Sequence, residues 1–139
     1  MADLTRFHEA QKYDYAAALE EIRSGRKRSH WMWYIFPQIA GLGRSSMAEY
    51  YSIRSLQEAV EYLKDPILGK RLMEISEALL ELDTNDASAV FGWPDDLKLR
   101  SSMTLFAEAD PDQQVFQKVL DKFFNGEKDR LTLEKLGRE

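Results

Sequence analysis

The segment of residues 25–38, GRKRSHWMWYIFPQ, combines side chains that suit an anionic ligand with a flat ring. A guanidinium group can donate paired hydrogen bonds to a phosphate or carboxylate, and an indole can stack on a planar ring. We therefore expect Arg28 to bind the anion and either Trp31 or Trp33 to stack on the ligand. Gln38 ends the segment and is placed at the same site. The alternative is a solvated basic turn joined to aromatics that fill the core.

His30 lies between the cations and the tryptophans of this segment. An unperturbed imidazole titrates near neutral pH, so His30 is the first candidate for proton transfer if the site is catalytic. A structural or anion-donating role is favoured over a catalytic one, because no carboxylate is close in the sequence. The chain has two histidines and no cysteine, which predicts no metal site. No cofactor is expected.

Two further segments supply small polar residues and cations. Residues 41–46, GLGRSS, resemble a loop that holds a phosphate, with Arg44 as the charge and Ser45 or Ser46 opening a helix. The segment lacks the lysine of a P-loop and the third glycine of a dinucleotide fingerprint, so a tight turn with a helix cap is the alternative.

Residues 93–104 form the other segment, in which Lys98, Arg100 and Ser101 are expected to close the far side of the site. A Ser–Lys pair can act as nucleophile and base, but serines in a helix more often allow another helix to approach closely. The sequence leaves open whether the glycine loop and this segment meet in space.

The distribution of charge supports a site in the first half of the chain. The net charge is -5, yet residues 22–47 contain five Lys or Arg and no Asp or Glu, so this acid-free window carries +5 against -10 elsewhere. A surface this negative repels a long polyanion, which makes nucleic acid an unexpected partner. A small anion responds mainly to the local site.

The chain lacks the apolar run that a membrane span or signal peptide needs, and the absence of cysteine suits a reducing compartment. We therefore expect a cytoplasmic protein with no membrane contact. The sequence does not indicate an oligomeric state.

Helical spacing of apolar residues recurs along the whole length, which predicts one all-α domain over residues 1–139. About six to eight helices of unequal length are expected, not a regular bundle. Caps, glycines and prolines bound helical segments near 4–24, 29–36, 46–51, 55–64, 67–80, 87–91, 95–108, 115–123 and 131–136. Among them, Ser55 and Asp65 are expected to cap helices and Asn125 with Gly126 to end one. The segment 29–36 also fits a buried strand, although Ser29 as an N-cap and Pro37 as a stop favour helix.

Four blocks of this sequence resemble a known family. They are residues 25–38, residues 41–43, the DPILG of residues 65–69 and the FGWPDDLKLRSSMTLF of residues 91–106. Together they are similar to the uncharacterised bacterial family catalogued as domain of unknown function 1810. The resemblance covers nearly the whole chain and implies a mainly helical, stand-alone domain, but it implies no activity.

Two hypotheses about function follow. In the first, the domain binds a small anionic molecule, phosphate-bearing and of a class that includes nucleotide-like ligands. In the second, the same basic and aromatic patch docks an acidic protein partner, which requires the aromatics of residues 31–36 to be partly exposed.

Overall fold

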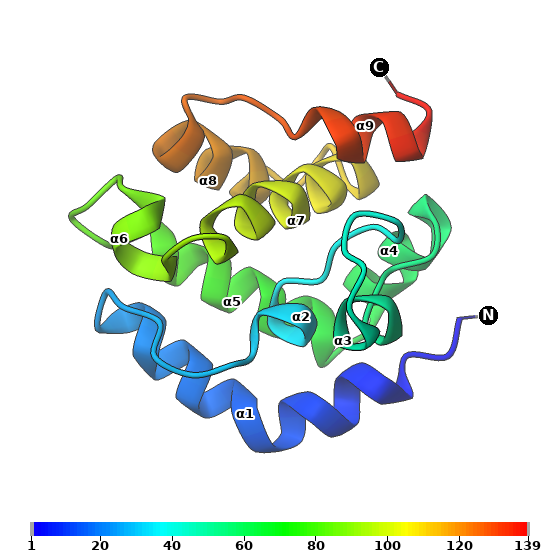
Figure 1. Ribbon diagram of the computed structural model, residues 1–139, viewed down its shortest axis with the longest axis horizontal. Helices are drawn as coiled ribbons and strands as arrows, with labels where there is room; N and C mark the ends of the chain where they lie inside the picture. Colours follow the sequence, from blue (N-terminus) through cyan, green and yellow to red (C-terminus); the bar gives the residue numbers. More distant parts are fainter. Residues whose placement is uncertain (1, 139) are drawn as a thin grey trace.

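The computed structural model describes residues 2–138, which form nine α-helices and no β-strand (Figure 1). The all-α class is confirmed. The nine helices correspond to the nine segments bounded from the sequence, and they exceed the expected count of six to eight by one. The helices are α1 Thr5–Arg23, α2 Met32–Ile35, α3 Ser46–Tyr50, α4 Leu56–Lys64, α5 Leu68–Leu80, α6 Ala87–Phe91, α7 Asp95–Ala109, α8 Val115–Phe124 and α9 Arg130–Leu136.

Local capping residues set most of the helix ends. The Ser55 Oγ accepts a hydrogen bond from the Glu58 N–H at the start of α4, as the sequence predicts. One carboxylate oxygen of Asp65 accepts bonds from the two N–H groups that precede and open α5. Asn125 ends α8 in the left-handed conformation with φ 54°.

One predicted cap was wrong, and one choice between two serines is decided. Ser29 does not open α2, which starts only at Met32, because the Ser29 side chain donates to Glu21 instead. The N-cap of α3 is Ser45 and not Ser46, since the Ser45 Oγ accepts a bond from the Ala48 N–H. Helix is nevertheless the right assignment for the segment after Trp31.

A continuous set of aromatic rings joins the long helices. Phe7 of α1 meets Tyr62 of α4 edge-on at 5.2 Å between centroids, and Tyr62 lies 5.3 Å from Phe106 of α7. Phe106 in turn lies 5.9 Å from Phe116 of α8. All four side chains are buried, so these rings form the centre of one core shared by four helices.

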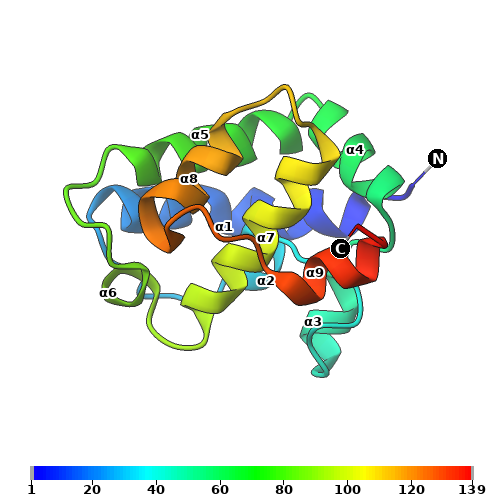
Figure 2. The ribbon, with the colours of Figure 1, turned by 90° about the horizontal axis from the view of Figure 1, so that it is seen from above.

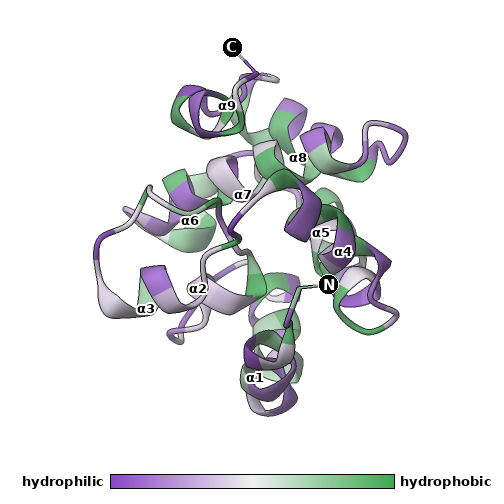
Figure 3. Cartoon of the chain, turned by 90° about the vertical axis from the view of Figure 1, so that its right-hand side faces the viewer, coloured by the Kyte–Doolittle hydropathy of each residue, from purple (hydrophilic) through white to green (hydrophobic). Residues whose placement is uncertain are grey.

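The arrangement of the helices follows from their amphipathic faces. In Figures 1 and 2, α5 lies beside both α1 and α8, and α7 crosses the molecule between α8 and the short helices α2 and α3. Hydrophobic and hydrophilic residues alternate around the long helices in Figure 3, as burial of one face requires. Within residues 2–138, no helix has the length and apolar character needed to cross a bilayer.

The segment between α2 and α4 is held in place by backbone pairing. The Ile53 N–H donates to the Gln38 carbonyl and the Ala40 N–H donates to the Ile53 carbonyl, both at 2.8 Å, around an isolated parallel bridge of Ile39 with Ile53. These bonds fix the start of the glycine loop, the stretch of residues 41–46. The loop then faces the first turns of α7 and the residues before α9.

Candidate functional site

The glycine loop and the beginning of α7 enclose one cavity of about 600 Å³, which we call the basic pocket. Six of the residues predicted from the sequence line it, and they come from both segments. These six are Gln38, Arg44, Ser45, Lys98, Arg100 and Ser101. Seven further residues complete the lining: Leu42, Gly43, Ala48, Pro94, Leu97, Asp129 and Leu131. The two segments that the sequence could not place relative to one another therefore meet.

Arg44 is the cation of this pocket that makes the fewest interactions with the rest of the protein. Its side chain is exposed, and within residues 2–138 it has neither a hydrogen-bond partner nor an ion-pair partner. A guanidinium in that condition keeps all its donors for a ligand.

Lys98 is partly engaged. Its Nζ lies 3.4 Å from one oxygen of Asp95, whose other oxygen pairs with the Lys27 Nζ at 2.9 Å. The same Nζ lies 5.5 Å from the centre of the Trp33 ring, in cation–π geometry. Lys98 therefore covers a face of Trp33, and Asp95 is shared between two lysines, which leaves positive charge in excess.

Arg100 and Ser101 have structural bonds. Arg100 donates to the carbonyl oxygens of Glu127 and Lys128 at 2.9 and 3.0 Å, and so holds the chain that leads into α9. The Ser101 Oγ lies 3.0 Å from an oxygen of Asp129, which also caps α9 by accepting from Thr132. One oxygen of the lining carboxylate of Asp129, Oδ2, thus accepts all three of these bonds from the protein.

Ser101 therefore does not fit the nucleophile of a Ser–Lys pair. Its neighbour Ser102 is fully buried, and neither hydroxyl is presented to the pocket as a free group beside Lys98. The alternative in which small residues allow close helix contact accounts for both serines.

The glycines shape the wall that carries Arg44. A Cβ on Gly43 would lie 2.6 Å from the Cβ of Ala48, so the loop can turn into α3 only with glycine at this position. Gly41 has a φ of +98°, and a Cβ there would lie 3.1 Å from the side chain of Lys135 in α9. The loop is therefore packed between α3 and α9.

Glu21 organises the cation-rich segment before α2. Its carboxylate accepts four hydrogen bonds, from the N–H groups of Arg28 and Ser29, from the Ser29 hydroxyl and from the Trp31 indole. Burial raises the pKa of Glu21, but these bonds stabilise the charged form and outweigh it, so the pKa falls from 4.5 to about 2. The acid-free window begins immediately after this residue, and its fold depends on it.

Four of the residues predicted from this segment do not line the basic pocket: Arg28, His30, Trp31 and Trp33. Trp31 is only 1% exposed and packs against Phe36 and Phe91, so the prediction that it stacks on a ligand was wrong for this residue. Arg28 and His30 are exposed but lie outside the lining. Trp33 is partly exposed and also lies outside the lining, where Lys98 covers a face of its ring.

The burial of residues 31–36 also bears on the partner-docking hypothesis. All of them except the partly exposed Trp33 are buried. The contiguous exposed aromatic patch which that hypothesis required in this segment is not present.

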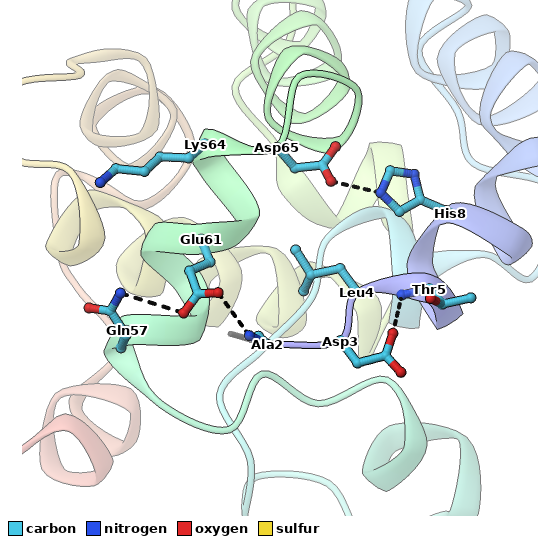
Figure 4. A pocket seen from close by; sticks show the side chains of 9 residues that line it. All are labelled: Ala2, Asp3, Leu4, Thr5, His8, Gln57, Glu61, Lys64 and Asp65. Carbon is cyan, nitrogen blue, oxygen red and sulfur yellow. Dashed lines mark hydrogen bonds and ion pairs between the residues drawn. The ribbon is translucent and has the colours of Figure 1, made fainter.

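A second cavity, of about 700 Å³, lies beside the first residues of α1, and we call it the amino-terminal pocket (Figure 4). The His8 Nε2 lies 2.7 Å from an Asp65 oxygen there, a pair that joins α1 to the start of α5. Sequence reasoning gave His8 no role, because nothing local marks a contact between residues 57 positions apart.

The carboxylates of this second cavity are already bonded. Asp3 accepts from the Thr5 N–H, Glu61 accepts from the Ala2 N–H, and Asp65 accepts from His8 and from the N–H groups at the start of α5. Burial raises the pKa of Asp65, but these hydrogen bonds lower it by more than burial raises it. The pKa of Asp65 therefore lies below its usual value. Within residues 2–138, no group of three metal-ligating side chains is arranged to hold a metal ion. The basic pocket is therefore the better candidate site.

Comparisons with known proteins agree with this description of the fold. A family model described as "Protein of unknown function (DUF1810)" matches residues 1–136. A solved structure, the conserved hypothetical protein Rv1873 from Mycobacterium tuberculosis at 1.38 Å, is similar to this chain with 47% sequence identity and a TM-score of 0.95. The similarity covers 97% of this chain and 96% of that one. No curated protein matches the chain.

Proposed function

The chain belongs to the family described as "Protein of unknown function (DUF1810)", whose name assigns no activity, and from the site itself we propose that it binds a compact phosphate-bearing anion in the basic pocket.

The observation that carries the proposal is the meeting of Arg44 with Lys98 and Arg100 around one cavity. Three cations and one carboxylate line it, so positive charge is in excess, and one oxygen of that carboxylate accepts bonds from Ser101 and Thr132. Arg44 keeps its donors free, and a planar guanidinium is well matched to phosphate oxygens.

The size and lining of the pocket fit a small molecule. Its volume of about 600 Å³ lies inside the usual range for ligand pockets. The neutral donors Gln38 and Ser45 stand beside the cations and can fix the orientation of an anion. A concave site of this size excludes a nucleic-acid duplex, in agreement with the overall negative charge.

The test is a thermal-denaturation screen of the whole chain against inorganic phosphate, sugar phosphates, nucleotides and ADP-ribose. A ligand at one hundred times its Kd adds about 2.7 kcal/mol of stability, which raises the melting temperature measurably. Replacement of Arg44 by alanine (Arg44→Ala) is expected to weaken binding roughly tenfold, because it removes a charge-assisted hydrogen bond.

The matched control is Arg26→Ala. Arg26 is also an exposed arginine of the acid-free window, but it does not line the pocket, so this variant loses the same charge and should bind as the wild type does. If no phosphate-bearing compound shifts the melting temperature, or if the two variants lose affinity equally, the basic pocket is not the binding site.

A further inference from the structure

Among the described residues that line the basic pocket, Asp129 is the one acid. Arg44, Lys98 and Arg100 line the same cavity, so its lining carries two positive charges in excess. A carboxylate repels an anionic ligand, and its presence at an anion site therefore needs a reason. That reason lies either in the fold or in the ligand.

The fold uses only one of the two oxygens of Asp129. Oδ2 accepts bonds from the Ser101 hydroxyl at 3.0 Å, from the Thr132 N–H at 3.1 Å and from the Thr132 hydroxyl at 2.6 Å. A helix N-cap needs one acceptor oxygen, and a neutral serine or asparagine supplies it equally well. The cap of α9 therefore explains Oδ2 but neither the negative charge nor the second oxygen.

The second oxygen, Oδ1, is a free acceptor on a lining residue. Within residues 2–138 it has no hydrogen-bond partner and no ion-pair partner. The buried polar atoms that lack a partner in this part of the chain are the Arg6 Nε and the Ser102 Oγ, so Oδ1 is not buried. An ionised carboxylate oxygen can only accept, and Oδ1 therefore requires a donor from solvent or from a ligand.

Asp129 is also held firmly in place. Its N–H donates to the Thr104 Oγ1 at 2.8 Å, and Arg100 binds the carbonyls of the two preceding residues. Thr104, Arg100 and Ser101 all belong to α7, which lies beside α9 in Figures 1 and 2. An acceptor fixed before binding loses little conformational freedom when a ligand arrives.

The charges of the lining indicate which donor suits Oδ1. A phosphate monoester carries about two negative charges at neutral pH, which balances the excess of the lining. The remainder of the ligand should then be neutral and should donate hydrogen bonds. Hydroxyl groups meet both conditions, whereas an ammonium group would face three cations. The Gln38 amide, which also has no protein partner within residues 2–138, can bond a further hydroxyl.

We infer that the ligand is the phosphate monoester of a sugar or polyol, in which a hydroxyl group donates to the Asp129 Oδ1 while Arg44 binds the phosphate. This inference rests on the proposed function, and it adds the class of ligand and the residue that selects it. Asp129 is a residue that the sequence did not single out.

The experiment compares phosphates with and without hydroxyl groups by isothermal titration calorimetry. The hydroxylated probes are glycerol 1-phosphate, ribose 5-phosphate and glucose 6-phosphate, and the reference is propyl phosphate, which has the carbon chain and charge of glycerol 1-phosphate without its hydroxyl groups. We expect at least one hydroxylated probe to bind roughly tenfold more tightly than propyl phosphate, because a hydrogen bond to a charged acceptor contributes about that factor.

Two substitutions assign this preference to Asp129, and both keep an oxygen that can cap α9. Asp129→Ser leaves no atom at the position of Oδ1 and should abolish the preference. Asp129→Asn should reduce it, because a neutral hydrogen bond is weaker than a charge-assisted one. Both variants should bind propyl phosphate at least as tightly as the wild type does, since a negative charge has left the site. A misfolded site would instead lose every ligand.

The matched control is Asp86→Asn. Asp86 caps α6 by accepting from the N–H groups of Ser88 and Ala89, but it does not line the pocket. This variant loses the same charge at the same kind of helix end, and it should bind every probe as the wild type does.

The outcomes separate the two proposals. Equal affinity for propyl phosphate and all the hydroxylated probes, dependent on Arg44, overturns the role of Asp129 and keeps the proposed function. A preference for hydroxylated phosphates that survives in Asp129→Ser also overturns that role. If none of the phosphates binds, or if Arg44→Ala binds them all as the wild type does, the proposed function itself fails.

Discussion

The cations of the acid-free window differ in their interactions with the protein, although the sequence does not distinguish them. Lys27 pairs with Asp95, whereas Arg44 has no protein partner within residues 2–138. Outside the window, Arg100 binds two backbone carbonyls. A count of positive charge therefore overestimates the groups that a ligand can use. Arg44 carries the binding proposal because its donors are uncommitted.

Glu21 shows how one buried carboxylate determines the course of a whole segment. Four donors from residues 28–31 converge on it, so the turn after α1 and the position of Trp31 both depend on its negative charge. Bonds to a charged acceptor are stronger than neutral ones, and the penalty for leaving buried donors unpaired is added when the acceptor is removed.

Replacing Glu21 by glutamine is expected to lower the free energy of unfolding at neutral pH by about 2 kcal/mol. The glutamine amide has only one oxygen to accept hydrogen bonds, and its NH₂ group would face N–H and O–H donors of the protein. The pKa of Glu21 is depressed in the fold, so its contribution is complete above pH 4.5 and is lost as the pH falls toward about 2. Urea denaturation at pH 7 and pH 3 measures the free energy of unfolding of both proteins. The difference between wild type and Glu21→Gln should be smaller at pH 3 than at pH 7.

Glu20→Gln is the control for that experiment, since Glu20 is the preceding residue of α1 and is exposed. It should differ little from the wild type at either pH. If the difference in free energy of unfolding between wild type and Glu21→Gln is the same at pH 7 and pH 3, the charge of Glu21 does not stabilise the turn.

The corner between α4 and α5 depends on the absence of a side chain. A Cβ on Gly69 would lie 2.1 Å from the backbone oxygen of Leu63, so the two helices approach too closely for any other residue. Asp65 caps α5 inside the same corner and pairs with His8 of α1. The corner therefore joins three helices at one point.

Gly69→Ala is expected to lower the free energy of unfolding by about 3 kcal/mol, because the overlap is with backbone and cannot be relieved by a rotamer change. The direction of this change is informative, because a glycine-to-alanine substitution inside a helix normally raises the free energy of unfolding by about 1 kcal/mol. A loss of stability would therefore report the steric overlap. Thermal and urea denaturation measure the change.

The neighbouring exposed residue supplies the comparison. Lys70→Ala lies on the solvent side of the same helix and should change the stability by less than about 0.5 kcal/mol. An unchanged or increased stability of Gly69→Ala would mean that α4 and α5 do not approach as closely as described.

The charge of the complete protein limits what the basic pocket can bind. The net charge of -5 surrounds a small positive cavity, so a long polyanion meets repulsion over most of the surface while a small anion meets the cavity alone. The cytoplasmic location and bacterial origin expected from the sequence remain predictions.

A short DNA duplex is therefore expected to bind more weakly than a Kd of about 10⁻⁴ M at physiological salt, at the low end of non-specific binding. Fluorescence anisotropy with a labelled duplex measures this, and a sugar phosphate in the same buffer provides the comparison for the small ligand. Micromolar duplex binding that weakens steeply with added salt would identify an extended basic surface instead of a pocket.

The sequence by itself determined the helices and most of their ends, since apolar spacing and capping act over a few residues. Ser55, Asp65 and Asn125 were each assigned correctly for that reason. It also singled out six residues of the basic pocket by their chemical types, but it did not show that they meet.

Only the tertiary structure decided which side chains share a site. The 54 positions between Arg44 and Lys98, and the 57 between His8 and Asp65, are closed by packing of the core, which no local pattern records. The same packing placed Trp31 inside and left Trp93 in solvent, because burial depends on how helices pair and not on residue type alone.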